Sequence, residues 1–238
     1  FGSAAKFAVS ALLIGGALFL GAYSQSGSLT VYNGLGTDVV VDIEGAGEFR
    51  IPSNSNRSIS VDYNVDYNIV TSTGDGIEVE SFEGAIGSPG KEYVYNIASA
   101  GVFVEYTVYY SNGGGAMPEN RNIGANRWFG ANVDYVLEDP PEEANVGTKK
   151  DVLVAYSDIN PYNMLSVVQD SSEMKSLIES HVIWDSPESK NILTWIALLQ
   201  YSDNPQIVLN QRIEKFGDDM MAARAKMDIA NDEEKNII

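Results

Sequence analysis

The stretch SLTVYNGLGTDVVVDI, residues 28–43, decides the fold class. Its two halves, 28–33 and 37–43, are rich in β-branched residues, which favour strands. The short GLG segment between them supplies turn residues. In the second half, alternate positions are apolar, which places one side of the strand against a core, and these positions are Val39, Val41 and Ile43. The stretch therefore predicts a β-hairpin.

Strand patterns continue through the middle of the chain. Turn-forming residues separate short β-branched or aromatic runs at intervals of about eight to twelve residues, a spacing typical of an antiparallel sandwich or barrel. We therefore predict an all-β antiparallel sandwich-like domain over residues 28–158. The last run is expected to be a buried central strand. The runs are 49–51, 58–61, 67–71, 76–82, 92–97 and 102–110.

A Gly- and Asn-rich segment at 112–126 interrupts these strands and predicts a long loop. Trp128 and Phe129 follow directly after it. An exposed Trp at such a place anchors protein interfaces, whereas a Trp that closes the core is the alternative. Trp128 and Phe129 are therefore candidate partner contacts.

Composition and charge restrict the classes of function. The 238 residues include 33 acidic and 15 basic side chains, and the net charge of -18 repels nucleic-acid phosphates. The absence of cysteine and the presence of one histidine exclude thiolate nucleophiles and multi-histidine metal centres. Acidic groups at 75–80 and 138–143 lack the ligand pattern of a calcium loop and are interpreted as solvated turn charge. We expect no catalytic residue, cofactor or metal.

A helical tail domain is predicted over residues 159–238. The segment 172–181 indicates one helix, and the single His181 near its end suits the negative end of the helix dipole rather than catalysis. Ser186 and Pro187 predict the start of another helix. Its apolar stripe is Ile192, Trp195, Ile196 and Leu199, of which Trp195 is a third candidate partner contact.

Two more helices follow after a break at 202–205. Leu209, Ile213 and Phe216 share a face of the first, which ends at Gly217. In the second, we expect Met220, Ala223, Met227 and Ala230 to form the core-facing stripe. Such short links make the helices antiparallel. Residues 186–231 resemble tetratricopeptide-type helical hairpins, which implies a protein-binding groove.

The start of the chain is apolar. Residues 7–23 carry no charge and are long enough to cross a bilayer, so we predict a transmembrane anchor helix at 1–24 and a linker at 25–27. Lys6 precedes the apolar run and the next basic residue is Arg50, which predicts that the C-terminal bulk is periplasmic or extracellular. A cleavable secretory signal is the alternative. Candidate helix-packing residues at four-residue spacing are Ala11, Gly15, Ala17 and Gly21.

Phe1 followed by an apolar helix resembles the N-terminus of type IV pilins. This resemblance implies a filament whose core is built from the N-terminal helices. The chain departs from the family at Ala5, where pilins have Glu.

Together these features predict a single-pass, non-enzymatic accessory or structural subunit of an envelope assembly. Its expected partners are membrane lipid and other protein subunits, contacted through the N-terminal helix and the helical tail, and a homo-oligomer is possible. A pilin-like filament subunit is the first alternative. A glycan-binding surface β-sandwich that uses tyrosines and carboxylates is the second.

Overall fold

The computed structural model describes residues 26–87, 89, 91–111, 120–156, 160–217 and 219–235. The predicted anchor at 1–24, with Ala11, Gly15, Ala17 and Gly21, lies outside the described residues. Within those ranges, no helix has both the length and the apolar character needed to cross a membrane. The predicted linker at 25–27 is wrong in part, because Ser26 and Gly27 already belong to the first strand.

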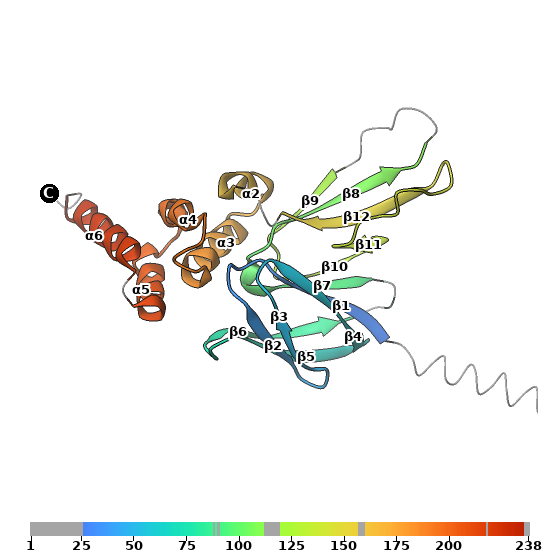
Figure 1. Ribbon diagram of the computed structural model, residues 1–238, viewed down its shortest axis with the longest axis horizontal. Helices are drawn as coiled ribbons and strands as arrows, with labels where there is room; N and C mark the ends of the chain where they lie inside the picture. Colours follow the sequence, from blue (N-terminus) through green and yellow to red (C-terminus); the bar gives the residue numbers. More distant parts are fainter. Residues whose placement is uncertain are drawn as a thin grey trace, which may run out of the picture.

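The described chain is β-rich, with several helices at its C-terminal end (Figure 1). Three four-stranded sheets make up the β part. The first sheet has the order β10 (Trp128–Ala131), β7 (Glu92–Asn96), β1 (Ser26–Asn33), β4 (Ser55–Asp62). The second has the order β3 (Gly47–Ile51), β2 (Val39–Ile43), β5 (Val65–Thr73), β6 (Glu78–Ile86). The third has the order β11 (Tyr135–Val136), β12 (Lys149–Ala155), β8 (Phe103–Tyr109), β9 (Asn120–Gly124).

Most neighbouring strands are antiparallel, as the sequence predicts, but β1 and β7 are parallel, as are β11 and β12. The hairpin predicted over 28–43 is wrong. β1 pairs with β4 and β7, whereas β2 pairs with β3 and β5 in the facing sheet. The connecting loop crosses between sheets because Asn33 fixes it: its amide donates to the carbonyls of Thr37 and Ile51, and its Oδ1 accepts from the Leu35 amide.

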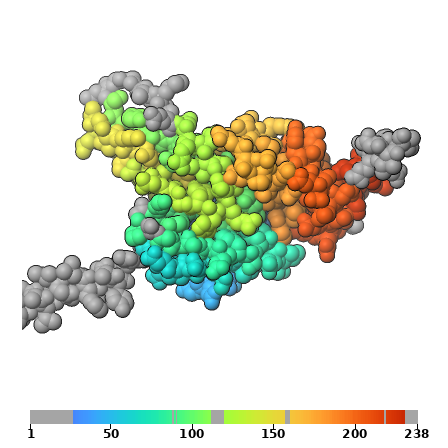
Figure 2. All heavy atoms as spheres, turned by 180° about the vertical axis from the view of Figure 1, so that it is seen from behind, coloured from blue at the N-terminus to red at the C-terminus, as the bar shows by residue number. Residues whose placement is uncertain are grey.

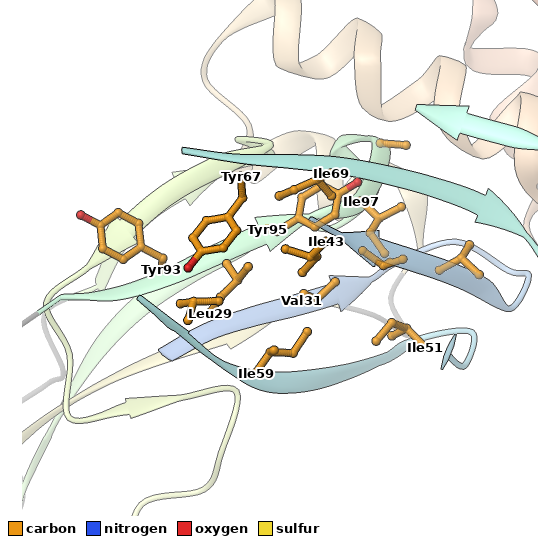
Figure 3. Packing of buried hydrophobic residues seen from close by; sticks show 14 of the residues in the cluster. Leu29, Val31, Ile43, Ile51, Ile59, Tyr67, Ile69, Tyr93, Tyr95 and Ile97 are labelled. Atoms are coloured by element: carbon orange, nitrogen blue, oxygen red, sulfur yellow. The ribbon is translucent and has the colours of Figure 1, made fainter. Parts of the chain in front are cut away.

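The main core lies between the first and second sheets (Figure 3). Val39, Val41 and Ile43 are fully buried there, which confirms the alternation read from the sequence. The opposite face of the first sheet meets the third sheet through a smaller cluster in which the rings of Tyr32 and Phe103 lie 5.3 Å apart. Strands β1 and β7 are thus covered on both faces, which explains their nearly continuous burial.

The segments at 102–126 differ in part from prediction. Strand β8 is buried at its start but becomes exposed towards Tyr109, so it is not a fully buried central strand. The predicted loop at 112–126 contains strand β9, and residues 112–119 lie outside the described part of the chain.

Helices follow the third sheet, and they are α2 (Pro161–Val167), α3 (Ser171–Trp184), α4 (Ile192–Leu198), α5 (Pro205–Phe216) and α6 (Met220–Lys235). Short 3-10 turns occur at Ile97–Ser99 and Leu199–Tyr201. Helix α3 begins where Asp170 accepts from the Ser172 and Glu173 amides. Helix α4 begins later than Ser186 and Pro187 predicted, whereas α5 matches its predicted limits. Figure 2 shows the helices, orange to red, forming one end of the molecule beside the sheets.

Candidate functional site

Helix α6 presents an apolar face to solvent. Met220 is 81% exposed and Met227 is 68% exposed, and Ala223 and Ala230 are exposed on the same face. The prediction that this face packs into the core is wrong. We call these four residues, Met220, Ala223, Met227 and Ala230, the α6 stripe.

The opposite face of α6 makes the core contacts instead. Ala222 is fully buried, and Ala225 and Ile229 pack against the same helical cluster. Small alanines allow helices to approach closely, and the Gln206 side-chain amide of α5 donates to the Lys226 carbonyl at 3.3 Å. Helix α6 therefore has two apolar faces, of which only one is used within the described chain.

A buried ion pair fixes the start of α6. Asp219 Oδ1 accepts from the backbone amides of Met221 (3.1 Å) and Ala222 (3.0 Å) and so caps the helix. Its Oδ2 lies 2.6 Å from Nε of Arg212, which is fully buried in α5. Asp219 thus satisfies two requirements at once, a helix cap and a counter-charge for the guanidinium.

The same guanidinium binds the end of α3. Arg212 Nη1 donates to the carbonyls of Val182 (2.6 Å) and Asp185 (2.8 Å). These are carbonyls at the C-terminus of α3, which have no partner inside the helix. One side chain therefore connects α3, α5 and α6.

Helix α3 in turn is bound to the sheets through His181 and Asp185. His181 Nε2 donates to the Ala100 carbonyl at 3.0 Å, and Nδ1 lies 3.1 Å from Asp185 Oδ2. Asp185 Oδ1 accepts from the Gly36 amide at 2.6 Å. Because both ring nitrogens already face acceptors inside the protein, His181 is placed to join elements rather than to take a proton from a substrate.

Trp195 packs on this junction. Its ring stacks on His181 with centroids 4.3 Å apart and planes 3° from parallel, and the residue is 2% exposed. A partner cannot reach Trp195 without opening the core. The interpretation of Trp195 as a partner contact is therefore corrected to a core residue of α4.

Trp128 and Phe129 lie on β10 and are partly buried within the chain. Trp128 contacts the rings of Phe82 and Tyr95, and its Nε1 donates to the Ala85 carbonyl at 3.2 Å. Phe129 meets Phe103, with centroids 5.3 Å apart. These contacts of Trp128 and Phe129 are thus internal. They fit the alternative stated for Trp128, in which the residue closes the core instead of anchoring a protein interface.

The acidic residues singled out at 75–80 have different surroundings, and the interpretation as solvated turn charge is wrong for Glu80. Glu80 is mostly buried and accepts from the Tyr95 hydroxyl (2.8 Å) and the Ala98 amide (2.6 Å), with Arg127 Nε at 3.1 Å. Burial, and then the charge of Glu80, raise the pKa of Tyr95 well above 10.0. Asp75 lies in the exposed β5–β6 turn, where the Thr73 hydroxyl lowers the pKa of its carboxyl. In the part of the chain that the structure describes, no three metal-binding side chains come together.

Sequence reasoning missed Arg212 and Asp219. Asp219 carried a signal, because an acidic residue just before an apolar helical pattern is a helix cap. Arg212 carried none, because its partners come from α3 and α6 and meet it only in the folded chain.

Comparisons with protein-family models, curated proteins and solved structures found no match for this chain.

Proposed function

We propose that this chain is a non-enzymatic accessory or structural subunit that works through protein–protein contacts, with the α6 stripe as its main contact surface. In the proposal, the apolar segment at 7–23 holds the subunit in a membrane, and the β-rich and helical parts lie outside the cytoplasm. The observation that carries the proposal is the exposure of Met220 and Met227 on a helix whose other face is already packed.

Single exposed apolar residues are common on protein surfaces and need no explanation. The α6 stripe differs because its members recur at three- and four-residue spacing along one helix face. Helices of this kind bind partners through the residues of one stripe. Methionine suits such contacts, since its flexible thioether adapts to the opposing surface.

Buried polar contacts within the chain fix the position of the α6 stripe. The Arg212–Asp219 pair and the His181–Asp185 junction connect α6, through α5 and α3, to the sheets. A surface held in one orientation loses less conformational entropy on binding than a mobile one. The buried polar groups of the helical part thus support presentation of the stripe.

Site-specific photo-crosslinking in intact cells tests the proposal. A photoreactive residue at Met227 is expected to give protein adducts of discrete mass with another subunit. The same residue at Asp228, which is exposed but points away from the stripe, is the matched control and is expected to give weak labelling. Equal labelling from both positions, or no protein adduct from Met227, would contradict the proposal.

The pilin-like filament subunit remains the alternative, supported by Phe1 and the apolar residues that follow it. The mass of the native N-terminal peptide separates the two: an N-methylated Phe1 supports the filament, whereas additional upstream residues support the anchor. The glycan-binding surface β-sandwich remains the second alternative, and a glycan-array signal that is lost when an exposed tyrosine is replaced would support it.

A further inference from the structure

A cleft of about 520 Å³ lies between the β5–β6 turn and helices α3 and α5. Apolar side chains from both the sheet and the helices form its walls, and they are Ile77, Val79, Ile183 and Trp184. Helix α5 contributes Gln211, Glu214 and Lys215 to the lining. Its size and its apolar walls are those of a small-molecule site.

Two cationic side chains of α5 each keep one buried nitrogen without a hydrogen-bond acceptor. Among the described residues, neither Lys215 Nζ nor Arg212 Nη2 has a partner, although both atoms are buried. Buried polar groups in folded proteins are nearly always hydrogen-bonded, and a buried cationic donor without an acceptor is especially costly. Of these two donors, Lys215 Nζ belongs to a residue that lines the cleft, and it points to an acceptor that comes from outside the chain.

Aromatic rings lie beside both cations. Lys215 Nζ lies 4.1 Å from the centroid of the Trp184 ring and 5.4 Å from that of Phe216. The Arg212 guanidinium lies over the same Phe216 ring at 4.8 Å. The two groups thus share one aromatic neighbour, and Trp184 joins them to the wall of the cleft.

The nearby carboxylates do not satisfy these donors. Asp219 is occupied by Arg212 Nε and by two backbone amides. Asp75 acts on Lys215 only through its charge, without an ion pair between them. Burial, assisted by the Arg212 charge and opposed by Asp75, holds the pKa of Lys215 below its ordinary 10.5.

We propose that this cleft binds a carboxylate carried on an apolar body, with Lys215 Nζ as the donor and Ile77, Val79, Ile183 and Trp184 around the body. A carboxylate suits this donor, since it brings a single negative charge to the single ammonium that lines the cleft. Glu78 and Glu214 also line the cleft, and their charges oppose an anion there, a doubly charged phosphate more strongly than a singly charged carboxylate.

Entry of the ligand involves a movement of Lys215. Its ammonium lies against the Trp184 ring, and its flexible four-carbon stem lets it turn from the ring to the carboxylate. Trp184 therefore reports on binding, because its indole loses a cation and gains the ligand body.

The test titrates the full chain with decanoate and follows the indole N–H signal of Trp184 by NMR, assigned with a Trp184→Phe variant. Decanol, which has the same apolar body without the charge, and decyl phosphate are the comparison ligands. Decanoate is expected to bind saturably and more tightly than either. Lys215→Met is expected to weaken decanoate binding about tenfold or more and to leave decanol unaffected, because a charged hydrogen bond is lost.

Lys190→Met, at an exposed lysine outside this cleft, is the matched control and is expected to bind like the wild type. Circular dichroism checks that the variants fold, and Lys215→Gln serves if the methionine variant does not. The proposal is overturned if decanol binds as tightly as decanoate, if decyl phosphate binds more tightly, or if the folded Lys215 variant keeps wild-type affinity for decanoate. None of these outcomes bears on the α6 stripe.

Discussion

Replacing Asp219 by alanine tests how the helical part is held together. The carboxylate caps α6 through Oδ1 and pairs with the fully buried Arg212 through Oδ2. Losing a helix cap costs about 1 kcal/mol, and leaving a buried charge without its partner costs about 3–5 kcal/mol. Because one side chain serves both purposes, Asp219→Ala is expected to lower the free energy of unfolding by about 4–6 kcal/mol.

Two further variants separate the contribution of the helix cap from that of the buried ion pair. Asp219→Asn keeps an oxygen for the cap but removes the charge, so it is expected to be about 1 kcal/mol more stable than Asp219→Ala. Combining Asp219→Asn with Arg212→Met removes both buried charges and is expected to recover part of the stability lost in Asp219→Asn alone. Replacing a whole buried pair costs less than breaking it.

Urea unfolding followed by circular dichroism measures these free energies, and amide hydrogen exchange locates the loss. In Asp219→Ala, the α6 amides are expected to lose protection before those of the sheets. The reasoning is refuted if Asp219→Ala unfolds within about 1 kcal/mol of the wild type, or if the double variant is no more stable than Asp219→Asn.

Three other perturbations have expected outcomes. Tyr95→Phe removes a buried hydroxyl that donates to Glu80, so it should cost about 1–3 kcal/mol of stability in urea unfolding, and a neutral effect would contradict that bond. At Gly34→Ala, the new Cβ would lie 2.6 Å from the Ala100 carbonyl oxygen, so thermal unfolding should occur several degrees lower, whereas an unchanged midpoint would show that the backbone yields freely. For Lys215, the folded-state pKa is below 10.5, so the unfolded chain binds more protons between these two values and stability rises with pH across that interval. The free energy of unfolding of the wild type relative to Lys215→Met should therefore increase as the pH approaches 10.5, and a decrease would reverse the assigned direction.

The strands could be predicted largely from alternation, but their partners could not. Val39, Val41 and Ile43 mark one buried face, as expected from the sequence. Yet β1 and β2 separate into facing sheets, because Asn33 bonds to the carbonyls of Thr37 and Ile51 and turns the chain across the core. Period-2 alternation reports which face is buried and carries no information about which strand lies alongside.

Helix α6 shows a different limit of prediction from sequence patterns. Its sequence contains two apolar stripes, and the larger side chains, Met220 and Met227, suggested the core-facing one. The folded helix buries Ala222 instead, and packs the partly buried Ala225 and Ile229 against the same cluster. Asp219 and Arg212 set the rotation of α6 at its first turn, and this pair forms only after α5 and α6 meet. Periodicity finds an amphipathic helix, whereas contacts outside the helix decide which apolar face is used.

Oxidation of methionine in the native setting tests the central claim most directly. Peroxide converts accessible thioethers to sulfoxides, and mass spectrometry counts them residue by residue. In the isolated chain, Met220 and Met227 are expected to oxidise rapidly and the buried Met164 slowly. In intact cells, a partner seated on the α6 stripe is expected to slow oxidation of Met220 and Met227 about tenfold or more relative to the isolated chain. Equal rates for these two residues in both settings would contradict the proposed contact surface.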